Sequence, residues 1–353
     1  MAIRVVQWTT GNVGKESLKA IVANPTLDLV GCFAWSPAKV GVDVGELAGI
    51  GPVGLAATND VDALLALAPD CVVYNPMWPS VDELVRILEA GVNVVTTAAF
   101  ITGANLGAER DRLVSACARG GSSLFGTGVS PGFAEFVAVT IAGICSRVDK
   151  VVVCETADTT FYDSPDTERA AGFGHPIDHP GLADMARTGT AVFGEAVAMV
   201  ADMLGVELDE IVCEAEFAQT TEDLVMTSWT IAAGHVAGLA ASWQGRISGR
   251  TIIDLNVRWK KGSTLEPPWR IEKDGWVITV EGLPTVTASL DFLPPPDFQA
   301  ETIEEFMVIG HIITALPALN AIAPVVNAPP GIVTYADFGL PLPRGWVRSA
   351  QAE

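Results

Sequence analysis

The first 126 residues alternate between short apolar runs and segments with the apolar periodicity of helices. The runs end at turn signals and lack the polar alternation of half-exposed strands; they cover residues 3–8, 27–34, 55–58, 71–74, 92–97 and 123–126. Helical patterns follow several of them, most clearly at 61–67, 81–90 and 108–119. Strands buried on both faces and separated by helices are typical of a parallel sheet. The pattern predicts an α/β fold with a doubly wound Rossmann domain over residues 1–145.

The pattern changes after about residue 145. Residues 161–181 are rich in Gly, Pro, Asp and His and are expected to form a long loop before a helix at 190–204. Strand signals dominate residues 210–293, and residues 253–260 alternate between apolar and polar. Asp274-Gly275 is a hairpin signal between two short apolar segments, 269–271 and 276–278.

These signals predict a second α+β domain over residues 146–300, with a mainly antiparallel sheet that has one polar face. A helical pattern at 302–316 then predicts a C-terminal segment, residues 301–353, that packs back on the Rossmann domain.

Composition narrows the range of partners. Hydrophobic residues make up 49% of the chain, and 21 basic against 42 acidic residues give a net charge of −21. An acidic chain repels nucleic acid and anionic membranes, so neither is expected as a partner. No uninterrupted apolar run reaches the length of a membrane span, which is about 18 residues. The high apolar content suggests either parallel strands buried on both faces or a large subunit interface, and we expect a homodimer.

The compartment and the metal content are also predicted from the sequence. The chain enters a strand pattern directly after Met1 without a charged leader, so a cytoplasmic protein is expected. Its six cysteines are scattered and show no zinc spacing, which predicts reduced core thiols and no metal site.

Glycines after the first strand point to a dinucleotide. Gly11-Asn12-Val13-Gly14 follows the strand and opens a helix. A pyrophosphate needs close backbone approach and gains from the N–H groups at a helix N-terminus. The cofactor-binding residues expected here are Thr10, Gly11, Asn12, Val13 and Gly14, although a tight turn that binds nothing would show the same pattern.

The end of the second strand bears on the choice of cofactor. An NAD site usually has a carboxylate there, whereas this chain has Ser36 and Lys39, which suit the 2′-phosphate of NADP. NADP is therefore expected, with NAD left open, and Lys39 could also be a solvated surface residue. Asn75, Pro76 and Thr97 follow later strands and are expected beside the nicotinamide, unless they are plain turn residues.

Two loops carry the candidates for binding the substrate. Glycine-rich residues 126–133 suggest backbone close to a ligand, with Ser130 and Phe133 beside it, or alternatively a linker into the second domain. The loop at 161–181 includes Phe173 and His175, and histidine suits acid–base work near neutral pH. A surface histidine is the alternative.

Three segments together resemble a known family: Trp8 to Lys15, Gly126 to Phe133, and the tail ending Ala328-Pro329-Pro330-Gly331. They are similar to the dihydrodipicolinate reductase-like family, in the branch of 2,4-diaminopentanoate dehydrogenases and native amine dehydrogenases. The resemblance implies an NAD(P)-binding Rossmann domain, a second domain that dimerises, and hydride transfer at a carbon that bears nitrogen or oxygen. It also implies that the C-terminal helix brings Thr314 near a small-molecule substrate.

The chain departs from the family pattern in two places. The His-His and lysine motif of true dihydrodipicolinate reductases is absent, which argues against that reaction. The glutamate with which the amine dehydrogenase branch handles ammonia is replaced by Ala98-Ala99-Phe100. Reductive amination needs a base. Glu155, Asp158 or His175 could substitute, with Asp158 also a candidate to bind the substrate, or the substrate is not an amine.

The resulting expectation is an NAD(P)-dependent oxidoreductase that exchanges hydride with a ketone, imine or amine carbon of a small, fairly apolar substrate. Glu155, His175 and Thr314 are the candidates for catalysis. The alternatives are a carbonyl or other reductase without amine chemistry, and a non-catalytic protein that binds the cofactor.

Overall fold

The computed structural model describes residues 2–162, 164–271, 273–341 and 343–344, and it leaves the side chains of Ile303 and Glu304 undescribed. The chain forms two compact units. Unit 1 runs to Phe133 and resumes at Val308, and unit 2 comprises residues 134–307. The sequence placed the corresponding divisions after residues 145 and 300.

Unit 1 is built on a parallel sheet with the strand order β15-β5-β4-β3-β1-β2. Every pairing in it is parallel. The strands are β1 (Ile3–Trp8), β2 (Leu27–Phe33), β3 (Cys71–Tyr74), β4 (Asn93–Thr96), β5 (Ser123–Gly126) and β15 (Gly331–Val333). This sheet confirms the predicted doubly wound Rossmann architecture.

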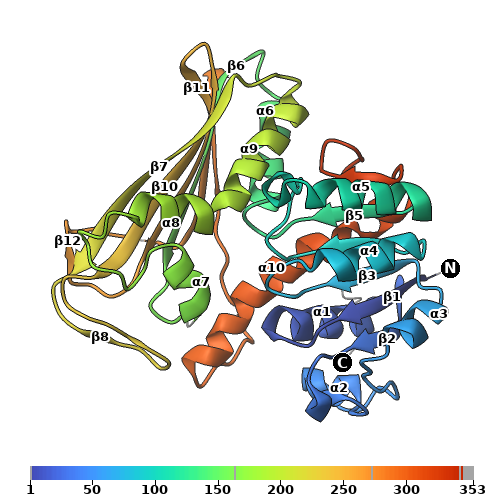
Figure 1. Ribbon diagram of the computed structural model, residues 1–353. Helices are drawn as coiled ribbons and strands as arrows, with labels where there is room; N and C mark the ends of the chain where they lie inside the picture. The colour runs from blue at the N-terminus through green and yellow to red at the C-terminus, as the bar shows by residue number, and fades with distance from the viewer. Residues whose placement is uncertain (1, 163, 272, 342, 345–353) are drawn as a thin grey trace. The chain divides into compact units, whose positions relative to one another are not determined.

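Helices cover both faces of this sheet, which explains the unbroken apolar runs of its strands (Figure 1). They are α1 (Asn12–Ala23), α2 (Val44–Ala48), α3 (Val61–Ala66), α4 (Val81–Glu89) and α5 (Glu109–Gly120), with short 3-10 turns at Pro37–Lys39 and Ala104–Leu106. Cys32 packs into a core cluster with Leu18 of α1 and Val44 of α2. The next residue, Phe33, packs into a second cluster with Leu84 of α4 and Leu113 of α5. Successive strand residues thus enter opposite cores.

Two details of the predicted sheet differ from the structure. Residues 55–58 form isolated bridges, Asp43 with Ala56 and Phe33 with Thr58, and no strand. The sixth strand is instead β15, which pairs with β5 more than 200 residues earlier in the chain. Local periodicity cannot predict such a pairing, because three residues carry too little pattern.

Unit 2 contains a seven-stranded sheet with the order β12-β7-β10-β11-β6-β13-β14. Its pairings are antiparallel except for β11 with β6. The strands are β6 (Arg147–Asp158), β7 (Glu210–Thr220), β10 (Val236–Ile247), β11 (Arg250–Lys260), β12 (Leu265–Glu266), β13 (Gly275–Leu283) and β14 (Val286–Leu290), with a separate pair of β8 (Leu224–Val225) and β9 (Thr230–Ile231). The predicted α+β class of this part is confirmed.

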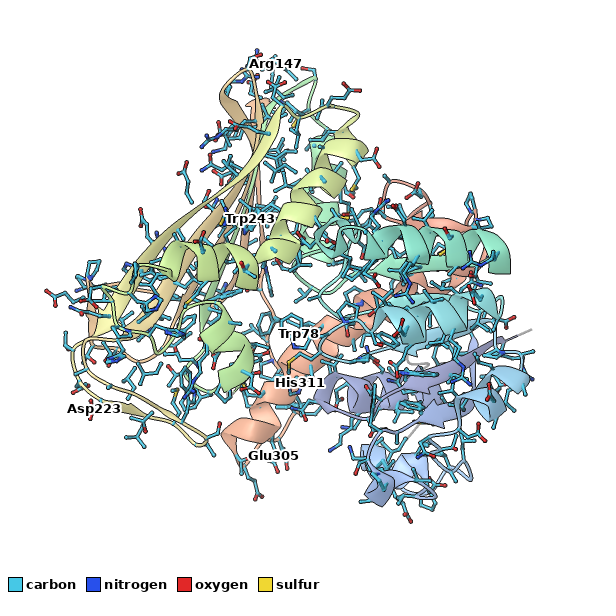
Figure 2. All side chains as sticks on the ribbon, viewed as in Figure 1. Trp78, Arg147, Asp223, Trp243, Glu305 and His311 are labelled. Carbon is cyan, nitrogen blue, oxygen red and sulfur yellow. The ribbon has the colours of Figure 1, made fainter. Side chains whose placement is uncertain are left out.

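The helices of unit 2 are α6 (Phe133–Ala142), α7 (Pro165–Ala170), α8 (Leu182–Gly189) and α9 (Ala191–Leu204). Helix α9 packs on β7, β10 and β11. Gly194 permits a close approach, because a Cβ there would lie 2.6 Å from the ring of Trp243, which Figure 2 labels on the sheet. Trp243 in turn donates its indole N–H to Thr190 Oγ1 at 2.9 Å.

Two expectations for unit 2 were wrong. Residues 161–181 are not one continuous loop, since α7 forms within them. Asp274-Gly275 does not close a hairpin with residues 269–271, because β13 pairs with β6 and β14 instead. Pairing with the long strand β6 buries Ile278 and Val280, which a hairpin to a three-residue segment could not do.

The C-terminal helix α10 (Ile303–Val326) continues ten residues beyond the predicted end at 316, through Pro317 and Pro324. Ala315, Ala318, Leu319 and Ile322 are buried, and this apolar burial outweighs the hydrogen bonds that proline removes. By length and composition alone, its segment Glu305–Val326 could cross a membrane, a test that the core helix of a soluble protein also passes.

Candidate cofactor and substrate site

The turn between β1 and α1 has a backbone that only a few residue types allow. Thr9 adopts a φ of 75°, in the left-handed region, and the chain then passes directly over Gly14. A Cβ on Gly14 would lie 2.5 Å from the carbonyl oxygen of Thr9, so no larger residue fits there without moving the turn. Gly11, the N-cap of α1, differs, because nothing lies within 4 Å of where its Cβ would be.

Apart from its chain neighbours, Gly11 thus has open space on this side, next to the N-terminal N–H groups of α1. A pyrophosphate needs that combination of free approach and donors. In the described part of the chain, the buried Oγ1 of Thr9 also has no hydrogen-bond partner. The residues of the turn therefore fit a dinucleotide, and the sequence-predicted set from Thr10 to Gly14 makes up this turn and the first turn of α1.

A buried amide joins the ends of three strands beneath this turn. Gln7, which is fully buried, donates from Nε2 to Thr9 O at 3.0 Å and to Asn75 Oδ1 at 2.7 Å. Asn75 in turn donates from Nδ2 to Thr97 Oγ1 at 2.8 Å. The carboxyl ends of β1, β3 and β4 are thus tied in one arrangement, with half-buried Pro76 following Asn75. Sequence reasoning missed Gln7, although an amide inside an apolar strand was the available signal.

Lys39 lies against the same turn. Its Nζ donates to the carbonyl oxygen of Thr10 at 3.0 Å and to Thr10 Oγ1 at 2.9 Å. Burial raises the pKa of the nearby Cys32 thiol to about 12, although the Lys39 charge opposes that shift. Ser36 is exposed and precedes the 3-10 turn that carries Lys39. Lys39 is thus bound to the glycine turn, Ser36 lies three residues before it in the same loop, and no carboxylate lies between residues 33 and 42.

The glycine-rich loop after β5 lies next to α10. Thr127 Oγ1 and Tyr335 Oη share a hydrogen bond of 2.9 Å, and a Cβ on Gly132 would meet Thr127 Oγ1 at 2.4 Å. On the other side of the loop, a Cβ on Gly128 would lie 3.9 Å from Thr314 Cγ2. Thr314 donates its hydroxyl hydrogen to Gly310 O at 2.8 Å, which leaves its oxygen able to accept. Ser130 and Phe133, in the same loop, are half-buried.

The position of the family glutamate contains no acid. Phe100 is buried, and Gly126 and Gly103 make room for it: a Cβ on Gly126 would lie 2.0 Å from Phe100 O, and one on Gly103 would lie 2.7 Å from its ring. Ala98 is buried, and Ala99 is exposed. Phe100 is therefore part of the core of unit 1, and the segment offers no base.

The remaining candidates belong to unit 2. Glu155 accepts one indole N–H at each carboxylate oxygen, from Trp259 at 2.8 Å and from Trp276 at 3.0 Å. Asp158, three residues along β6, pairs with Lys260 Nζ at 2.5 Å and accepts from Thr160. Burial acts to raise the pKa of Asp158. The hydrogen bonds from Lys260 and Thr160 outweigh this effect and hold that pKa below its usual value. Asp158 is thus an ion-paired carboxylate and a poor base.

Phe173 and His175, the two candidates in residues 161–181, differ in accessibility. Phe173 is buried, so it is a core residue rather than an accessible contact for a substrate. His175 is half-buried, and its ring centre lies 5.3 Å from that of His179. In the part of the chain that the structure describes, no three His, Cys, Asp or Glu side chains are grouped so that they could hold a metal ion.

A buried lysine holds the segment that carries these residues. Lys261 is fully buried, and its Nζ contacts Glu168 Oε1 at 2.6 Å, Thr159 O at 2.6 Å and Tyr162 O at 2.8 Å. Three acceptors compensate for the cost of burying an ammonium group. Sequence reasoning missed this pair, because its members are 93 residues apart.

Comparisons with known proteins show the family and the fold of this chain. The 2,4-diaminopentanoate dehydrogenase C-terminal domain family matches residues 134–353. An amine dehydrogenase of Streptomyces virginiae is 31% identical over 355 residues, which cover 96% of each chain. A 2,4-diaminopentanoate dehydrogenase of Acetoanaerobium sticklandii is 25% identical over 272 residues, 74% of this chain and 70% of the other. The solved structure of an amine dehydrogenase from Mycobacterium smegmatis gives a TM-score of 0.79 at 21% identity and covers 98% of each chain.

Proposed function

Because the chain belongs to the family of the 2,4-diaminopentanoate dehydrogenases and is a nicotinamide-dependent oxidoreductase, we propose that it exchanges hydride between NADP and a ketone, imine or amine carbon of a small, fairly apolar substrate. The cofactor supplies or accepts the hydride, and the protein supplies binding and orientation. The observation that carries the proposal is the open Gly11 turn with Lys39 bound to Thr10 beside it.

The preference for NADP rests on the charge at the end of β2. A cation and a hydroxyl, Lys39 and Ser36, suit a 2′-phosphate, and no carboxylate is present to bind a free ribose hydroxyl. The test is a thermal titration with NADPH and with NADH, because a ligand that binds only the folded state raises Tm. A larger rise with NADPH supports the proposal. Equal rises would overturn the preference, and no rise with either would overturn the dehydrogenase function.

Amine chemistry requires a base from outside the segment at Ala98–Phe100. Of the three candidates in unit 2, Asp158 is held ionised by Lys260, which leaves Glu155 and His175. Within unit 1, Ser130 and Phe133 of the glycine-rich loop and Thr314 of α10, which lies next to that loop, are proposed to position the substrate. Thr314 can accept a hydrogen bond from the substrate, because its hydroxyl hydrogen is donated to Gly310 O.

The reaction is tested by following NADPH oxidation over a panel of small ketones, with and without ammonium. A rate that requires ammonium identifies reductive amination. His175→Asn should then lower the rate by about 10²–10⁴-fold if His175 is the base, a typical value for general acid–base catalysis. His179→Asn is the matched control, since its ring lies beside that of His175. Glu155→Gln is the corresponding test of the carboxylate.

The absence of an acid at residues 98–100 specifically favours a second candidate, a carbonyl reductase without amine chemistry. It predicts the same NADPH oxidation with and without ammonium, and no oxidation of amines in the reverse direction. Tight binding of NADPH without turnover of any ketone or amine would instead identify a protein that binds the cofactor without catalysis.

A further inference from the structure

Trp35 presents a large aromatic surface at the carboxyl end of β2. It is 57% exposed, although it follows Phe33 and Ala34, which are both buried. Trp78 is exposed to a similar extent, and a single exposed tryptophan is not by itself a site. Its surroundings decide what it can do.

The ring of Trp35 is held by other rings. Trp8 and Phe33 stack in the core, with ring centres 4.3 Å apart and planes 14° apart. The ring of Trp35 meets Phe33 at 5.5 Å and 80°, so that the contact is edge to face. The backbone on either side is also anchored, because Ala34 N donates to Thr58 O and Lys39 N donates to Ser36 O. A ring fixed in this way loses little conformational entropy when it binds a ligand.

Lys39 ties the loop that carries Trp35 to the glycine turn. Its Nζ bonds Thr10 at the turn itself, and it lies only four residues after Trp35. In a doubly wound fold, the pyrophosphate lies at the N-terminus of the first helix and the adenosine ribose lies at the end of the second strand. The loop at the adenosine end of the turn therefore carries both a flat apolar ring and a cation.

We propose that Trp35 is the positioning residue for the adenine of the cofactor, and that it stacks on the purine while Lys39 meets the 2′-phosphate. The ligand recognised here is an adenosine 2′-phosphate, and the inference rests on the proposed function. Stacking on a base is favourable with little regard to sequence, since every purine offers a π-face. Trp35 acts on binding and does not touch the carbon that accepts hydride.

The experiment measures Kd for 2′,5′-ADP and for NADPH by calorimetry with the full chain. Trp35→Ala should raise Kd for 2′,5′-ADP by about tenfold or more. Trp35→Phe should keep most of the wild-type affinity because a ring remains. Val40→Ala is the matched control, as Val40 is an exposed apolar residue of the same loop. Its Kd values should equal those of the wild type, and Tm without ligand shows that each variant is folded.

A kinetic measurement separates positioning from catalysis. With any substrate found for the wild type, Trp35→Ala should raise KM for NADPH and leave kcat at saturating NADPH unchanged. Unchanged Kd values for Trp35→Ala would overturn the inference while leaving the proposed function intact. Failure of the wild type to bind either nucleotide would overturn both.

Discussion

Replacing Gly11 with alanine should separate cofactor binding from folding. Gly11 has φ −75° and ψ −171°, a conformation that alanine adopts freely, and no atom lies within 4 Å of the added methyl group. Fixing fewer conformations on folding stabilises alanine by about 0.4–1 kcal/mol relative to glycine. Alanine is a poorer N-cap, which costs a similar amount. The free energy of unfolding should therefore change by less than about 0.5 kcal/mol.

The cofactor should be affected much more. The methyl group would occupy the open side of the turn where the pyrophosphate must approach the backbone. We expect Kd for NADPH to rise at least tenfold, which corresponds to about 1.4 kcal/mol. Calorimetric titration gives Kd, and urea unfolding without ligand gives the free energy of unfolding. Wild-type affinity in Gly11→Ala would refute the placement of the pyrophosphate. A large loss of stability would refute the claim that a methyl group on Gly11 finds open space.

Gly14→Ala is the contrasting variant. Its Cβ would lie 2.5 Å from Thr9 O, so the turn must move, and overpacking of this kind costs about 1–3 kcal/mol. This variant should lose both stability and affinity. Equal changes in the free energy of unfolding for Gly11→Ala and Gly14→Ala would show that the difference in space around the two glycines does not affect stability.

Three further predictions concern stability. Lys261→Met leaves the buried Glu168 carboxylate without its cation and should lower the free energy of unfolding by about 3–5 kcal/mol, measured in urea; a change below about 1 kcal/mol would contradict the buried pair. Asn75→Ala removes an acceptor from the buried Gln7 amide and should cost about 1–3 kcal/mol in the same assay, whereas an unchanged midpoint would show that the network is dispensable. Burial lowers the pKa of His311 below its usual 6.5, while Glu16 opposes the shift, so the folded state favours the neutral ring. The stability that the neutral ring contributes is therefore lost as pH falls below about 6.5. His311→Gln should therefore lose less Tm than the wild type between pH 7.5 and pH 5.5, and parallel curves would count against this assignment.

His311 illustrates a limit of sequence reasoning. It lies among apolar residues on α10, where Figure 2 labels it, and it is half-buried. Its electrostatic partners are Glu16 and Lys19 of α1, about 290 residues earlier in the chain. No local pattern could have named them.

The sequence by itself determined the parallel sheet, the glycine turn and the family. Each of these rests on a signal confined to a short segment: an apolar run, a glycine pair directly after a strand, or a motif of eight residues. Strands buried on both faces leave such runs because helices cover both sides of the sheet. The bounds of β1, β3 and β5 were therefore predicted to the residue.

Only the tertiary structure decided which apolar residues fill the core and which strands pair. Phe100 and Phe173 are buried while Trp35 is exposed, although all three are aromatic residues in loops. Strand β15 joins β5, and β13 joins β6 rather than a local hairpin. The physical reason is that burial and pairing depend on neighbours distant in the chain, whereas periodicity reports only on the residues of one segment.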